Sequence, residues 1–139
     1  MSEKVTYKDL LEVSHGIREC IKLPGKEFAL ACVKNHKLIV KHMDKFNSRF
    51  PTVEGFDLLN EKFQQGQKAT TPENRLEFES AFKEEHKELI EKQEKLEAER
   101  DLALQEVVEG FEGWNKIKNS VIPHAITVEQ LSGIEKILV

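Results

Sequence analysis

Cysteine is scarce in this chain, where Cys20 and Cys32 are the only two among 139 residues. They do not form a Cys-x-x-Cys pair or another metal-type spacing, and two are too few for the disulfide framework of a small secreted protein. We therefore expect both thiols to be free and buried as small hydrophobic side chains in a reducing compartment.

Long apolar stretches are also missing. The first ten residues, MSEKVTYKDL, lack the apolar centre of a secretion signal. No segment approaches the roughly 18 apolar residues that a membrane-spanning helix requires. The expected location is cytoplasmic, with no membrane partner.

The motifs of metal, nucleotide and nucleophilic chemistry are absent as well. There is no His-Glu-x-x-His segment, and Lys83 stands where a Glu-x-x-His pair ending at His86 would need its carboxylate. Gly110 and Gly113 do not form a phosphate-binding loop. We therefore expect no enzyme, no metal site and no cofactor.

The dominant feature that is present is a charged helical segment. Thr71 is a favourable N-cap, Pro72 suits the first helical position, and no glycine or further proline follows up to Glu109. This pattern predicts one helix over 71–109, about 55 Å long.

The predicted long helix has a narrow apolar seam at coiled-coil spacing, formed by Phe78, Phe82, Leu89, Leu96, Ala103 and Val107. Glu85, Gln93 and Arg100 interrupt this seam. Polar residues at such positions reduce stability and set register or pairing. Two interpretations stay open: an intramolecular hairpin with solvated gaps, and a seam that opens to accept a partner helix.

A second helix is predicted over 26–50, because Pro24-Gly25 and Pro51 flank a segment with helical periodicity. Its apolar stripe consists of Phe28, Cys32, Asn35, Ile39, Met43, Phe46 and Phe50. The opposite side carries a lysine strip, defined as Lys34, Lys37, Lys41 and Lys45. We expect the stripe to pack antiparallel on the seam of the long helix. The lysine strip is either a solvated face or a contact for an acidic partner, a phosphate backbone or the acidic helix of the same chain.

Capping signals predict two further helices. Thr6 and Asp9 open a helix that ends near Leu23, with Leu10, Val13, Ile17 and Ile21 facing inward. Thr127 and Gln130 form a capping box for a final helix through Leu138.

The linking segments are less regular. A short helix is predicted over 56–63, followed by a mobile loop over 64–70. The glycines around Phe111 and Trp114 favour an extended segment, although for residues 104–122 the sequence leaves extended and helical structure equally open.

Together these elements predict a mainly α protein, with an antiparallel helical hairpin, an N-terminal helix and a small C-terminal helical cap. We expect one elongated domain over 1–139, composed of 1–70, the acidic helix 71–109 and the C-terminal part 110–139. Charge is divided along it: residues 22–49 carry seven basic against two acidic residues, and residues 71–109 carry six against thirteen. With a net charge of −4, general nucleic-acid binding is not expected.

Three segments, TYKDLLEVSHGI (6–17), LPGKEFALACVKNHK (23–37) and AITVEQLSGIEKIL (125–138), together with the acidic middle helix, resemble a family of small bacteriophage or prophage proteins of unknown function. The resemblance implies an accessory role, in virion assembly or in dealing with the host. It transfers no catalytic residue, and it implies a location in the host cytoplasm or on the virion.

The expected function is therefore non-enzymatic protein binding in an assembly or structural role, with a protein partner or a second copy of the chain as the occupant. The alternative is a host-directed inhibitor whose acidic face mimics nucleic acid. The residues predicted to bind the partner are Lys34, Lys37, Lys41, Lys45, Glu85, Gln93, Arg100, Phe111 and Trp114.

Overall fold

The computed structural model describes residues 4–139, and the contacts divide the chain into two compact units. The first unit joins Met1–Arg49 with Ala103–Val139, and the second is the intervening Phe50–Leu102. These boundaries differ from the three segments that the sequence predicts, and the behaviour of the chain as a single domain stays a prediction. Helices dominate both units, which confirms the predicted mainly α class.

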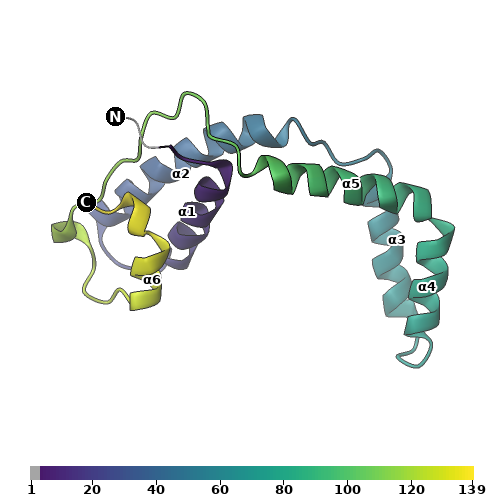
Figure 1. Cartoon of the computed structure of the whole chain (residues 1–139). Coiled ribbons are helices and arrows are strands. Elements are labelled where there is room, and N and C mark those ends of the chain that lie inside the picture. The colour runs from purple at the N-terminus through teal and green to yellow at the C-terminus, as the bar shows by residue number, and fades with distance from the viewer. Residues whose placement is uncertain (1–3) are drawn as a thin grey trace. The chain divides into compact units, whose positions relative to one another are not determined.

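The first unit contains the helices α1 (Tyr7–Glu19), α2 (Lys26–Asn47) and α6 (Val128–Gly133), with 3-10 turns at Asn119–Val121 and Glu135–Ile137. Helix α1 packs against both α2 and α6 (Figure 1). The cap predicted at Thr6 with Asp9 and the capping box predicted at Thr127 with Gln130 are both present. The helix predicted to continue through Leu138, however, ends at Gly133, and a 3-10 turn follows at Glu135–Ile137.

The apolar stripe of α2 forms the centre of the first unit. Six of its seven residues are buried as the periodicity predicts, namely Phe28, Cys32, Asn35, Ile39, Met43 and Phe46. The seventh, Phe50, lies beyond the end of α2 at Asn47 and belongs to the second unit. Four further residues complete this core and are fully buried: Leu10, Ile117, Ile134 and Ile137.

Residues 104–118, which follow α5, form an extended segment with turns rather than a helix, and this segment covers the beginning of α1. The N–H groups of Tyr7 and Lys8 donate to the carbonyls of Glu106 (3.2 Å) and Leu104 (2.9 Å). A helix leaves its first N–H groups without intrahelical acceptors, and these two carbonyls supply them. The interactions explain why the helix predicted to reach Glu109 ends at Ala103 instead.

The second unit contains α3 (Phe56–Ala69), α4 (Arg75–Glu85) and α5 (Lys87–Ala103, whose last residue is grouped with the first unit). Helices α3 and α4 lie side by side as an antiparallel hairpin (Figure 1). A hairpin is thus present, but the pairing predicted between 26–50 and 71–109 is wrong, because α4 pairs with α3 and α2 pairs with α1.

The single helix predicted over 71–109 is also corrected: it starts at Arg75 and is interrupted at His86. No glycine or proline causes this interruption. Instead, the apolar residues on its two sides pack on different segments: Phe82 contacts Phe63 of α3 (ring centroids 5.1 Å apart), whereas Leu89 approaches Gly55. Tertiary packing therefore overrides the local helical preference.

The loop predicted to be mobile over 64–70 is helical up to Ala69. Gly66 lies directly under the ring of Phe78, where any Cβ would overlap the ring. The glycine that suggests a loop in the sequence therefore permits close packing of two helices.

Candidate protein-binding groove

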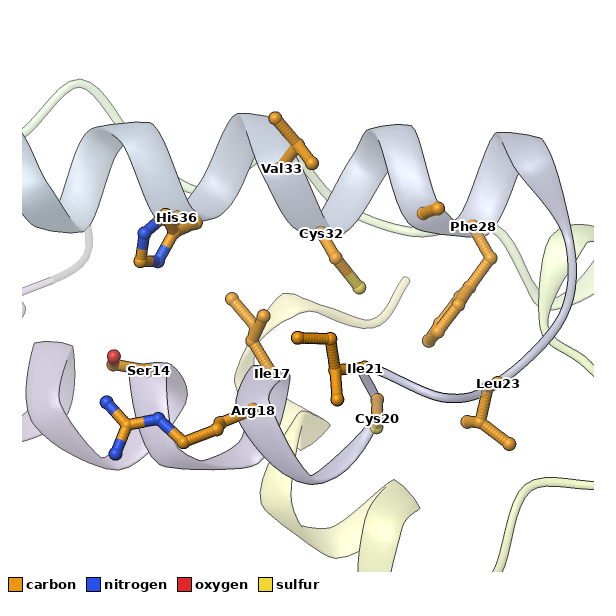
Figure 2. Close-up of a pocket in the computed structure, with 11 residues that line it drawn as sticks. Ser14, Ile17, Arg18, Cys20, Ile21, Leu23, Phe28, Cys32, Val33 and His36 are labelled. Carbon is orange, nitrogen blue, oxygen red and sulfur yellow. The ribbon is translucent and has the colours of Figure 1, made fainter.

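A pocket of about 300 Å³ opens between α1 and α2, beside the turn that joins them. Figure 2 shows Ile17, Ile21, Phe28 and Cys32 around the space between the two helices. Its remaining lining residues are Ser14, Arg18, Cys20, Leu23, Ala29, Val33 and His36. We call this site the α1–α2 groove.

Local sequence explains why the two helices leave a groove here. The turn is closed by Leu23 N–H donating to the carbonyl of Cys20 (3.0 Å), and Gly25 adopts a φ of 113° that permits α2 to start at once. Phe28 fills the floor and is almost fully buried. The small side chains Ala29 and Cys32 on the next turn do not fill the remaining space, so the groove stays open.

The groove is apolar along most of its length and polar at one end. Ser14, Arg18 and His36 lie together at that end, whereas Leu23 and Phe28 lie toward the other (Figure 2). Binding sites in proteins are typically apolar concavities with a few polar groups that fix orientation.

Both cysteines contribute to this site, and both are free. Burial raises the pKa of the Cys20 thiol, and it raises the pKa of Cys32 to about 11. Since the thiolate is the reactive form, the raised pKa disfavours nucleophilic reactivity of both thiols. Their contribution to the groove is apolar surface.

The rim carries aliphatic side chains that remain partly or largely exposed. Ile21 is 79% exposed and Val33 is 46% exposed. Leu30 and Val40 extend this exposed aliphatic surface along α2. Exposed aliphatic side chains beside an apolar groove are typical of an interaction site.

The lysine strip lies on the exposed side of α2, as the sequence predicts. Lys41 donates to Oε1 of Glu112 at 2.6 Å, so this member is engaged with the segment after residue 103. That hydrogen bond and the positive charge lower the pKa of Glu112. Lys34 and Lys37 form no ion pair within residues 4–139.

Glu85, Gln93 and Arg100 are not brought together on one continuous helix, because the interruption at His86 separates Glu85 from the other two. Glu85 is exposed and Arg100 is half-buried. Gln93 is only 7% exposed, and its Oε1 accepts from the N–H of Val53 at 3.0 Å. Its observed partner is therefore in its own unit, and a role of these three residues in binding stays a prediction.

The two aromatic residues predicted at an interface pack against the first unit. Trp114 is buried, and its ring meets that of Phe111 edge-on with centroids 4.9 Å apart. Phe111 in turn contacts His42, with ring centroids 5.6 Å apart. In this arrangement the pair anchors the extended segment onto α2.

The groove residues Ile17, Ile21 and Val33 do not appear among the predicted binding residues. Ile21 was expected to face inward, but α1 ends at Glu19 and the following turn directs Ile21 to solvent. One signal was available in the sequence: Leu30, Val33 and Val40 lie outside the apolar stripe of α2 and had no assigned partner.

Within residues 4–139, no group of three or more His, Cys, Asp or Glu side chains is placed to hold a metal ion. In the same part of the chain, no helix combines the length and apolar character needed to cross a bilayer. Comparison with known proteins adds no relative: no family model matches the chain, and neither the curated proteins nor the solved structures contain a significant match.

Proposed function

We propose that this protein is a non-enzymatic binding protein that accepts an α-helix of another protein in the α1–α2 groove. The observation that carries the proposal is the coincidence of an open apolar groove with exposed aliphatic side chains on its rim, Ile21 and Val33. Amphipathic helices bind such grooves by inserting an apolar ridge with residues at i, i+3 or i+4, and i+7.

The dimensions of the groove support a helical ligand. From Phe28 to His36 the α2 wall extends over about 12 Å, a little more than two helical turns. Three successive ridge residues of a partner helix cover about 10 Å. The groove therefore matches the shortest helical ridge that provides three anchors.

The accessory role in a bacteriophage or prophage setting rests on the sequence resemblance of residues 6–17, 23–37 and 125–138. Within that setting, a groove that accepts a partner helix suits assembly with another protein. The alternative inhibitor that imitates nucleic acid depends on the acidic residues of 71–109. Six basic residues are interspersed among them, which weakens the imitation of a continuous phosphate charge.

The test places a photo-crosslinking amino acid at position 33 in the full chain, produced in the cells in which the protein functions. As the matched control, the same amino acid replaces Val128, which is 83% exposed and lies in the same unit. We expect a crosslinked protein at position 33 that does not form at position 128.

The captured protein is then purified and its affinity is measured for the unmodified chain, Val33→Glu and Val128→Glu. A charge in the apolar rim should weaken binding at least about tenfold in Val33→Glu, because a buried unpaired carboxylate is costly. Val128→Glu should bind like the unmodified chain. Equal binding by all three proteins would refute the groove as the binding site.

A further inference from the structure

We infer that the helix received by the α1–α2 groove is acidic: its apolar ridge is flanked by glutamate or aspartate. This inference rests on the proposed function, because it specifies the partner of the same groove. The evidence for an acidic partner is the charge of the residues around the groove, and not the shape of the groove.

The charge around the groove is opposite to that of the whole chain. Between Ser14 and Lys37, the segment that forms both walls, five basic residues stand against two acidic ones, whereas the chain has a net charge of −4. The five are Arg18, Lys22, Lys26, Lys34 and Lys37.

These five cations are available to a partner. Each is exposed, and none forms an ion pair with another residue in 4–139. Lys41, Arg49 and Lys136 of the same unit, by contrast, are paired with Glu112, Glu106 and the carboxylates of Asp9 and Glu12. Lys4, Lys8, Lys45 and Lys118 of the first unit are also exposed and form no ion pair among the described residues, so five of these nine cations lie in the segment that forms the groove walls.

Part of this charge lies beside each wall of the groove. Arg18 lines the α1 wall, and Lys37 on α2 follows the lining residue His36 and is one helical turn beyond Val33. Lys22 and Lys26 flank the turn at the apolar end. A helix in the groove consequently lies near positive charge at each wall and at one end.

A second copy of this chain is a poorer occupant than a different protein. The most acidic helical segment within the described chain is α4–α5, where Leu76 and Ala81 are the exposed apolar residues of α4 and Ala98 and Leu102 those of α5. Neither pair forms the three-residue ridge that the groove accommodates. The occupant that fits both the groove and its charge is an acidic amphipathic helix of another protein.

The test uses two stapled helical peptides with the same leucine ridge at i, i+3 and i+7. One carries glutamate on both flanks and the other carries lysine. Affinity for the full chain is measured by fluorescence anisotropy at low and high ionic strength. We expect the acidic peptide to bind at least about tenfold more tightly at low salt, with a smaller difference at high salt because the charges are exposed.

Variants separate this inference from the proposed function. In K34E/K37E the preference between the peptides should shrink or reverse, whereas the matched change K62E/K68E in the second unit should leave it unaltered. Val33→Glu should weaken both peptides. Equal affinity for the two peptides, with binding still lost in Val33→Glu, would overturn the acidic partner and leave the groove intact.

Two other results would contradict more than the acidic character of the partner. Failure of both peptides to bind, or binding that Val33→Glu does not change, would contradict the groove function itself. A molecular mass that rises with protein concentration and is restored to the monomer by Val33→Glu would assign the groove to a second copy of the chain.

Discussion

Gly16 of α1 and Gly133 at the end of α6 meet backbone against backbone, so a Cβ on Gly16 would overlap the carbonyl oxygen of Gly133. The contact joins two helices that lie far apart in the sequence. Buried apolar residues such as Ile134 lie next to it. Because the obstructing atoms belong to the backbone, no side-chain movement relieves the overlap.

Gly16→Ala should therefore destabilise the first unit by at least about 3 kcal/mol, at or above the upper end of the usual cost of overpacking. The fluorescence of Trp114, the single tryptophan, reports unfolding of this unit in denaturant. His15→Ala is the control, since His15 is exposed on the same helix and its replacement should change stability by less than about 0.5 kcal/mol. Similar stabilities of the two variants would show that α6 does not pack on α1 as described.

Asn35 connects α2 to the extended segment. Its Nδ2 donates to the carbonyl of Asn115 at 2.9 Å, and its Oδ1 accepts from the N–H of Asn115 at 2.9 Å. Asn35→Ala should cost about 1–3 kcal/mol, because both backbone groups of Asn115 lose their partner.

Asn115→Ala is a stringent control for this prediction. Asn115 takes part through its backbone, so the alanine variant retains both hydrogen bonds and should remain within about 0.5 kcal/mol of the unmodified chain. Denaturant unfolding followed by Trp114 fluorescence measures both variants. A larger loss in Asn115→Ala than in Asn35→Ala would contradict the assigned hydrogen bonds.

Gln93 gives a prediction opposite to the one that its position in the seam suggests. A polar residue in an apolar seam should be replaceable by leucine with a gain in stability. In the structure, however, Gln93 provides the acceptor for the N–H of Val53. Gln93→Leu should therefore lower the stability of the second unit by about 1–3 kcal/mol.

Far-UV circular dichroism during thermal unfolding measures this effect, because the second unit has no tryptophan. Glu85→Leu serves as the control and should be nearly neutral, since Glu85 is exposed. A higher melting temperature for Gln93→Leu would restore the interpretation of Gln93 as a pairing residue.

His42 should make the first unit sensitive to acid. The imidazole is buried against Phe111, and its Nε2 has no hydrogen-bond partner within the described residues. Burial, followed by the neighbouring Lys41 and Lys45 charges, lowers its pKa below the ordinary value of 6.5. The unfolded chain thus takes up a proton first as the pH falls.

Stability should consequently be greatest above the unfolded-state pKa and should decrease as the pH falls through about 6.5 toward the lower folded-state pKa. Denaturant unfolding between about pH 8 and about pH 5, followed by Trp114 fluorescence, measures the decrease. His42→Phe should lose the part of the decrease that His42 causes, and His15→Gln should retain it. An unchanged pH profile in His42→Phe would exclude His42 as its source.

The sequence is informative wherever the signal is local. The two helix caps, the buried stripe of α2 and the exposed lysine strip are all present as predicted, because each depends on residues within a few turns of one another. The predicted pairing of 26–50 with 71–109 is wrong because helix pairing is not a local property. The apolar face of each helix can pack on several other helices, and α2 packs on α1 whereas α4 packs on α3.

The interruption at His86 and the end of α5 at Ala103 have a similar origin. Both are imposed by distant contacts, with Phe63 and Gly55 in one case and with the N–H groups of Tyr7 and Lys8 in the other. The groove itself depends on where α1 ends relative to Ile21. A shift of a few residues at this helix end changes Ile21 from an expected core residue into rim.

The division of the first unit into two stretches of sequence also determines the order in which the chain can fold during synthesis. The second unit is contiguous and has local contacts, so its helices can form as soon as residue 102 has left the ribosome. The first unit must wait for residues 103–139, because Ile117, Ile134 and Ile137 belong to its core. Until they arrive, the apolar faces of α1 and α2 have no cover from α6 and are open to chaperones or to premature association.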